Sequence, residues 1–76
     1  MLEALFAPTA LAVAGASAQK GKLGHTVLRN IVQYGYRGRI YPINPRADEI
    51  LGLKAYPKVS DLPERVDLVV VVVPPP

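Results

Sequence analysis

The segment at residues 11–30, LAVAGASAQKGKLGHTVLRN, decides the fold. Its apolar start, Leu11 to Ala14, predicts a short strand, and a loop from Gly15 to Gly21 follows. From Leu23 onward, apolar residues recur three and four positions apart, which is the spacing of one face of a helix. A strand, a glycine loop and a helix in this order predict an α/β fold.

The sequence after this segment predicts a second strand and shorter elements. Gly35 follows the helical pattern, at a position where helices favour a residue that tolerates positive φ. We expect a strand from Arg39 to Ile43, ended by Asn44-Pro45, because proline lacks a ladder donor and restricts the residue before it. The remaining expectations are a short helix at 47–51, a brief edge strand at 54–56, and a helical turn at 60–64 capped by Ser60.

Five consecutive valines, Val69 to Val73, belong to the last predicted strand, Val66 to Val73. A helical membrane span needs about 20 apolar residues, so this run does not predict one. Continuous valine runs are typical of parallel strands that are buried on both faces. We therefore expect an α/β fold with an open parallel sheet and helices on both faces. Residues 1–76 would be the N-terminal part of one such domain, with its C-terminal side further along the chain.

The amino-acid composition excludes several kinds of site and indicates the charge of a partner. The chain has no cysteine and one histidine, so disulfides and cysteine-ligated or histidine-rich metal sites are excluded, and no metal site is expected. The net charge is +3, and the stretch between Glu3 and Asp48 carries six cations and no acid. Such a stretch indicates an anionic partner, or otherwise a solvated basic face. With one phenylalanine, four tyrosines and no tryptophan, a base-stacking platform is not expected, and a polyphosphate cofactor is favoured over nucleic acid.

The N-terminal segment imitates a secretory signal peptide without completing one. Leu2 to Phe6 can form a helical turn, and the apolar run to Ala14 precedes small residues that resemble a cleavage site. The basic start of a signal peptide is missing, since Glu3 stands there, and Pro8 interrupts the run. We therefore expect a cytoplasmic chain that does not contact a membrane.

The loop after the first strand can hold an anion. Gly15, Gly21 and Gly24 allow backbone N–H groups to approach a phosphate, and the start of the helix adds unpaired N–H donors and partial positive charge. The alternative is a tight connection in which the glycines serve backbone geometry alone. Side chains that can assist an anion site are those of Ser17, Lys20 and Lys22.

Two common phosphate-binding motifs do not fit this loop. A P-loop has four residues between its first glycine and its Gly-Lys pair, whereas five residues separate Gly15 from Gly21. The dinucleotide fingerprint fails because Ser17 stands at its second glycine. After the second strand, where NAD-binding units carry an acid, this chain has Arg46. A cation there favours a phosphate near a ribose, as in NADP or coenzyme A, unless Arg46 only begins a surface helix; the spacing leaves these alternatives open.

Three segments together carry a resemblance to a known family. They are LFAPTALAVAGAS at residues 5–17, the stretch from residue 20 to residue 64, and VDLVVVVVP at residues 66–74. The chain resembles the N-terminal CoA-binding domain of ADP-forming acetyl-CoA synthetases, the NDP-forming acyl-CoA synthetases, which are related to the α subunit of succinyl-CoA ligase. Similar segments open bacterial protein-lysine acetyltransferases.

The resemblance implies a ligand and its site. The fold would be Rossmann-like, an open parallel sheet with helices on both faces and the first strand at its centre. The loop from Gly15 to Gly24 would hold the phosphates of coenzyme A, with Arg46 near the 3′-phosphate. Pro74 would help to line the adenine and ribose side. No catalytic residue is implied, and His25 is not expected to be the phosphoryl carrier of the family. The implied CoA-binding residues are Gly15, Ala16, Ser17, Lys20, Gly21, Lys22, Gly24, Asn44, Pro45, Arg46 and Pro74.

The resemblance also implies a reaction for the protein of which the chain would be part. A carboxylate, ATP and CoA would exchange with acyl-CoA, ADP and phosphate, and the other domains or subunit of the synthetase would be the partners of this segment. An oligomer is left open. The alternative is a regulatory module that senses CoA or NAD(P)(H), such as the N-terminal part of a lysine acetyltransferase or a redox sensor.

Overall fold

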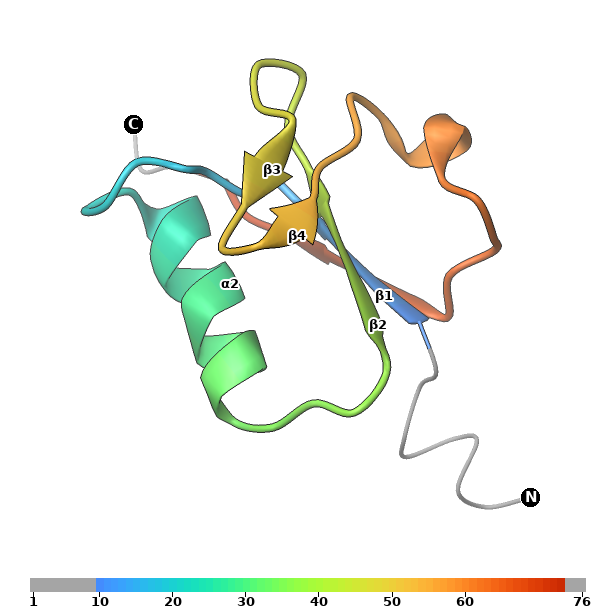
Figure 1. Ribbon diagram of the computed structural model, residues 1–76, viewed down its shortest axis with the longest axis horizontal. Helices are drawn as coiled ribbons and strands as arrows, with labels where there is room; N and C mark the ends of the chain where they lie inside the picture. Colours follow the sequence, from blue (N-terminus) through green and yellow to red (C-terminus); the bar gives the residue numbers. More distant parts are fainter. Residues whose placement is uncertain (1–9, 74–76) are drawn as a thin grey trace.

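The computed structural model describes residues 10–73, and three parallel strands form its centre (Figure 1). Strand β1 (Ala10–Ala14) lies between β2 (Arg39–Ile43) and β5 (Leu68–Val71). Both neighbours run parallel to β1, with Ala12 opposite Tyr41 on one side and opposite Val69 on the other. The predicted α/β fold with a central first strand is confirmed, and the bounds of β2 are those expected from the sequence.

One face of the sheet is covered by helix α2 (Leu23–Gln33) and a small hairpin of β3 (Glu49–Ile50) and β4 (Leu53–Lys54). Figure 1 shows the segment 57–66, with the 3-10 helix η1 (Val59–Asp61), on the other side of the strands. Helices were expected on both faces, but within residues 10–73 the second face carries only this short 3-10 helix. In the same described part of the chain, no helix has the length and apolarity to cross a membrane.

Two local predictions are wrong. The segment 47–51 is not a helix, because Leu51 and Gly52 adopt positive φ values of 54° and 79° and turn the chain between β3 and β4. Positive φ at both central positions suits the twist of a two-residue hairpin. Ser60 does not cap the turn after β4, since Lys58 precedes η1 and no side chain caps it.

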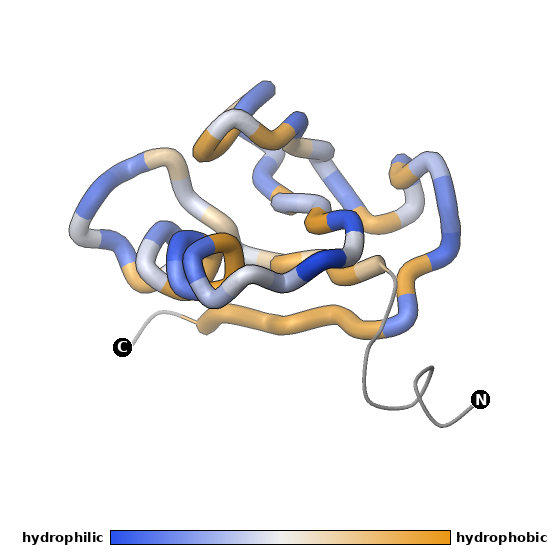
Figure 2. The backbone as a smooth tube through the Cα atoms, turned by 60° about the horizontal axis from the view of Figure 1, so that its bottom comes forward, coloured by the Kyte–Doolittle hydropathy of each residue, from blue (hydrophilic) through white to orange (hydrophobic). Residues whose placement is uncertain are grey.

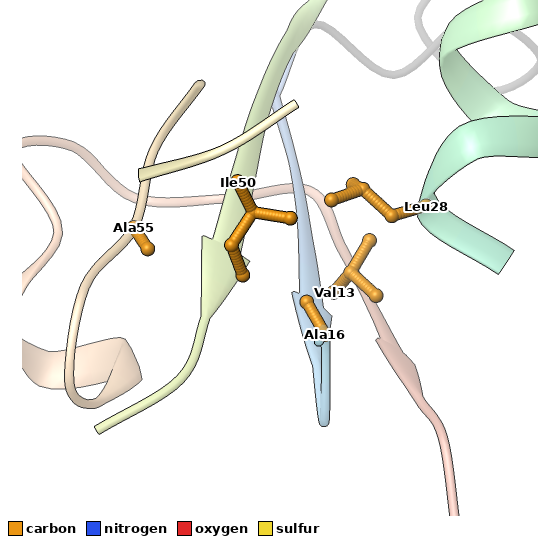
Figure 3. Packing of buried hydrophobic residues seen from close by; sticks show 5 residues of the cluster. All are labelled: Val13, Ala16, Leu28, Ile50 and Ala55. Atoms are coloured by element: carbon orange, nitrogen blue, oxygen red, sulfur yellow. The ribbon is translucent and has the colours of Figure 1, made fainter. Parts of the chain in front are cut away.

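The described core lies between β1, α2 and the hairpin. Val13, Leu28 and Ile50 are at most 2% exposed, and Figure 3 shows their side chains converging from the three elements. Ala16 and Ala55 complete this cluster. Because Leu28 lies in the second turn of α2, its burial against Val13 fixes the start of the helix beside the carboxyl end of β1.

Strand β5 is less buried than its valines led us to expect. It pairs with β1 alone among the described strands, so it lies at an edge of the sheet. Figure 2 shows that it is hydrophobic along its length, yet Val69 is 39% exposed and Val71 is 66% exposed. The regular strand is also shorter than predicted, Leu68–Val71 in place of Val66 to Val73.

Arg39, Tyr41 and Glu64 form a hydrogen-bonded cluster that links the segment 57–66 to β2. The guanidinium of Arg39 donates through Nη2 to Glu64 Oε1 at 2.7 Å, and its Nε and the Tyr41 hydroxyl both donate to Glu64 Oε2. These hydrogen bonds, led by that of Arg39, hold the pKa of the Glu64 carboxyl below its ordinary value of 4.5. The cluster therefore stabilises the position of this segment more strongly when Glu64 is ionised.

We expect Glu64→Gln to remove an acid-sensitive part of the stability. A carboxyl whose pKa is lower in the folded state contributes stability above its unfolded pKa, and this contribution is lost as the pH falls through the folded pKa. Melting temperatures measured from neutral pH down to about pH 3 should therefore fall less steeply for Glu64→Gln than for the unchanged protein. Glu49→Gln, on the exposed side of the hairpin, is the control. Parallel curves for Glu64→Gln and the unchanged protein would contradict the assignment.

Candidate functional site

A cleft of about 500 Å³ lies where β1 and β2 end and α2 begins. Strand β1 continues to β2 through α2, whereas β5 lies on its other side, so the cleft opens at the point where the strand order changes direction. Ligands of open parallel sheets bind at such switch points, outside the carboxyl ends of the strands. The lining residues are Gly15, Ala16, Ser17, Lys22, Leu23, Gly24, Ile43, Asn44, Pro45, Arg46 and Val72.

Two glycines bring the helix start against the end of β1. A Cβ atom on Gly24 would lie 1.9 Å from the carbonyl oxygen of Gly15, so only glycine fits in this arrangement. Gly15 itself has a φ of 90°, and a Cβ there would lie 2.5 Å from the carbonyl oxygen of Val72, just after β5. Gly21 shares the positive φ but has open space around it. Gly15 and Gly24 therefore allow the backbone segments to approach each other closely, whereas Gly21 allows the positive φ of the turn.

The first turn of α2 presents unpaired donors to the cleft. Lys22 is the N-cap residue, its side chain makes no capping hydrogen bond, and no acid occupies the first turn. The carbonyl of Lys22 accepts from the N–H groups of His25 and Thr26. Within the described chain, the N–H groups of Leu23 and Gly24 have no acceptor, and both residues line the cleft. This is the arrangement in which a helix start binds an anion.

Asn44 joins the two sides of the cleft. Its Nδ2 donates to the carbonyl of Ala16 at 2.9 Å, and its Oδ1 accepts from the N–H of Arg46 at 2.7 Å. One side chain thereby links the glycine loop to the end of β2. Because both ends of the amide are already engaged, Asn44 positions the two walls of the cleft.

Arg46 lines both the cleft and a second, smaller cavity. This cavity has a volume of about 280 Å³ and shares Ser17, Asn44 and Arg46 with the main cleft. The Ser17 oxygen accepts from the N–H of Gln19 at 3.1 Å, which leaves the hydroxyl hydrogen free to be donated. Arg46 lines both cavities, Lys22 lines the main cleft, and none of the described lining residues is acidic. The electrostatics favour an anionic ligand.

The cleft collects most of the residues that the sequence singled out. Lys20 and Gly21 belong to the glycine loop but do not line the cleft, and Pro74 lies outside the described residues. The sequence reasoning did not identify Leu23, Ile43 and Val72, which form apolar walls. Ile43 could have been found as the last residue of a predicted strand, whereas Val72 depends on the order of strands in the sheet. The predicted residues that line the cleft are Gly15, Ala16, Ser17, Lys22, Gly24, Asn44, Pro45 and Arg46.

The sequence matches a family described as the CoA binding domain over residues 9–76. A trans-feruloyl-CoA synthase from an unknown prokaryotic organism is 51% identical over 75 residues, which are 99% of this chain and 11% of that protein. The α subunit of the ADP-forming acetate–CoA ligase I of Pyrococcus furiosus is 47% identical, over 96% of this chain and 17% of its own length.

Solved structures agree with these matches. The apo form of the dinucleotide-forming acetyl-coenzyme A synthetase 1 of Ca. Korarchaeum cryptofilum is 56% identical and superposes with a TM-score of 0.87. The alignment covers 96% of this chain and 16% of that one, so this chain spans a small part of its relatives. The family match covers nearly the whole sequence, and the cleft has the donors and positive charge that a phosphate-bearing ligand needs. The chain therefore belongs to the CoA binding domain family.

Proposed function

We propose that the chain is the CoA-binding segment of an NDP-forming acyl-CoA synthetase and that the cleft holds the phosphates of CoA. The observation that carries the proposal is the uncapped start of α2, whose unpaired N–H groups meet basic side chains and no carboxylate. The relatives named above are CoA ligases and synthetases, which supports this class of enzyme over other CoA-binding proteins. The protein would exchange a carboxylate, ATP and CoA with acyl-CoA, ADP and phosphate.

In such an enzyme, this chain would bind CoA and other parts of the protein would carry out the reaction. The chain spans 11% and 17% of the two curated relatives, so in this proposal it holds CoA while the remainder supplies the reacting groups. The pyrophosphate of CoA would accept from the N–H groups of Leu23 and Gly24 and from the Ser17 hydroxyl, with Lys22 as a nearby cation. These contacts orient the ligand and take no part in bond breaking.

Arg46 is proposed to contact the 3′-phosphate of CoA. It lies at the boundary of the two cavities, and its backbone is held by the Asn44 side chain. A guanidinium can bind a phosphate through two parallel hydrogen bonds. An arginine that contacts only solvent would not distinguish ligands with and without the 3′-phosphate. Arg46 could equally contact the 2′-phosphate of NADP, so binding experiments must distinguish CoA from NADP as the ligand.

Arg46→Ala is expected to remove most of the preference for CoA over 3′-dephospho-CoA. A hydrogen bond to a charged group contributes about 1.5–3 kcal/mol, which is about a 10- to 150-fold change in affinity. Calorimetric titration of the protein with each ligand measures this preference. Arg37→Ala is the matched control, because Arg37 lies between α2 and β2, away from the cleft. An unchanged preference in Arg46→Ala would discard the assignment.

Titration of the unchanged protein with CoA, 3′-dephospho-CoA, NADH and NADPH tests the proposal as a whole. CoA should bind most tightly, and removal of its 3′-phosphate should weaken binding. Tighter binding of a nicotinamide dinucleotide would overturn the proposal in favour of a redox-sensing module. CoA binding by a whole protein that does not convert acyl-CoA, ADP and phosphate into carboxylate, CoA and ATP would favour a CoA-sensing regulatory module.

A further inference from the structure

The backbone of Asn44 is held in place on the hairpin side of the cleft. Its N–H donates to the Tyr56 carbonyl at 2.8 Å, and the N–H of Tyr56 donates to the Pro42 carbonyl at 2.9 Å. These bonds extend the end of β2 with a parallel bridge between Ile43 and Tyr56. Because the backbone of Asn44 is fixed, its side-chain amide can hold other groups in position.

The amide of Asn44 links the backbones on either side of the cleft. Nδ2 donates to the carbonyl of Ala16, the residue before Ser17, in a partly buried hydrogen bond of 2.9 Å. Ala16 is 2% exposed and belongs to the core cluster, so the loop is firmly held at this end of the bridge. At the other end, Oδ1 accepts from the N–H of Arg46 at 2.7 Å. Pro45 has no N–H, so Arg46 supplies the first backbone donor after Asn44.

This bridge lies between the groups that are proposed to hold the two phosphate positions of the ligand. Ser17 and Arg46, at its two ends, each line both cavities. The N–H groups of Leu23 and Gly24 are positioned separately, by the close contact of Gly24 with Gly15. Loss of the bridge would therefore release Arg46 from the loop and leave the start of α2 in place. Its effect should fall on recognition of the 3′-phosphate and spare recognition of the pyrophosphate.

We propose that Asn44 is a positioning residue for Arg46 and that the preference for the 3′-phosphate depends on its bridge to Ala16. This inference rests on the proposed function of the cleft. It differs from the direct contact with CoA that the resemblance implies for Asn44, because Nδ2 and Oδ1 are already engaged within the protein. The arginine would bind the phosphate, and the amide would set the distance of the arginine from the glycine loop.

Asn44→Ser tests the bridge. A serine hydroxyl can accept from the N–H of Arg46, but it ends one bond earlier than the amide and falls short of the Ala16 carbonyl. Calorimetric titration should show the preference for CoA over 3′-dephospho-CoA reduced about three- to tenfold, the effect of one neutral hydrogen bond. The affinity for 3′-dephospho-CoA should stay close to that of the unchanged protein, which also shows that the variant is folded. Asn30→Ser, the same change in α2 outside both cavities, is the control and should alter neither affinity.

The pattern of affinities separates the alternatives. Equal weakening of both ligands would overturn the proposal in favour of a direct contact between Asn44 and CoA, and an unchanged preference would show that the bridge does not position Arg46. Because Asn44 acts through Arg46, Asn44→Ser combined with Arg46→Ala should show the same preference as Arg46→Ala alone, and a further loss would contradict positioning. Failure of the proposed function looks different, since the unchanged protein itself would then bind CoA no better than 3′-dephospho-CoA.

Discussion

Gly24→Ala is expected to weaken CoA binding about a hundredfold or more. The new Cβ would lie 1.9 Å from the Gly15 carbonyl oxygen, 3.0 Å from its carbonyl carbon and 3.2 Å from that of Ala16. All three atoms belong to the backbone, so no side-chain rotation can relieve the contact. The start of α2 must move away from the end of β1, and the N–H groups of Leu23 and Gly24 move with it. Loss of two hydrogen bonds to a charged ligand, at about 1.5–3 kcal/mol each, gives this magnitude.

Calorimetric titration with CoA measures the effect, and circular dichroism establishes that the variant is folded. Gly52→Ala is the matched control, because Gly52 lies in the β3–β4 turn, outside the cleft, with no atom within 4 Å of an added Cβ. It should lower stability through its positive φ and leave the affinity for CoA unchanged. A folded Gly24→Ala that retains the affinity of the unchanged protein would show that the glycine contact does not shape the site.

The sequence predicted best the elements whose signals are local. Helix α2 has a clear apolar spacing, and β2 is ended by Pro45, so their positions could be read without knowledge of the rest of the fold. The segment 47–51 failed because its composition suits a helix, whereas burial of Ile50 against Leu28 and the turn at Leu51 and Gly52 favour a hairpin. Packing with a distant helix overrode local propensity there.

The site was predictable to a similar degree. The glycine loop and Arg46 were identified because strand ends and helix starts meet at one edge of a parallel sheet. The bridge from Asn44 to Ala16 was not predictable, since it joins residues 28 positions apart and depends on how the two loops close. Lys20 belongs to the same loop but does not line the cleft, so its role in binding stays a prediction. Residue type indicated an anion-binding chemistry, and the fold determines which of these residues line the cleft.

The valine run shows how composition and position can diverge. Val69 and Val71 have the character of a fully covered strand, but in the described residues they lie on an edge strand and remain partly exposed. The end of β5 nevertheless contributes to the site, because Val72 lines the cleft and donates its N–H to the Ala14 carbonyl at 2.9 Å. The contact between this strand end and Gly15 is therefore the point at which a small substitution should disturb both fold and cleft.

Gly15→Ala is expected to lower the free energy of unfolding by about 2–3 kcal/mol. A non-glycine residue at a φ of 90° costs about 1–2 kcal/mol. In addition, the new Cβ would lie 2.5 Å from the Val72 carbonyl oxygen and 3.3 Å from the Val72 Cβ. Relief of this contact moves Val72 away from β1 and weakens its hydrogen bond to Ala14, which is worth about 0.5–1.5 kcal/mol.

Gly21→Ala separates the two causes. Gly21 has a φ of 91°, nearly the same as Gly15, but an added Cβ would meet no atom within 4 Å. Urea unfolding of both variants therefore compares one backbone penalty with and without the contact to Val72. Gly15→Ala should be the less stable by about 1 kcal/mol, and it should also bind CoA more weakly, because Val72 forms part of the cleft wall. Equal free energies of unfolding for the two variants would mean that β5 shifts without loss of stability. The contact between Gly15 and Val72 would then not hold the strand in place.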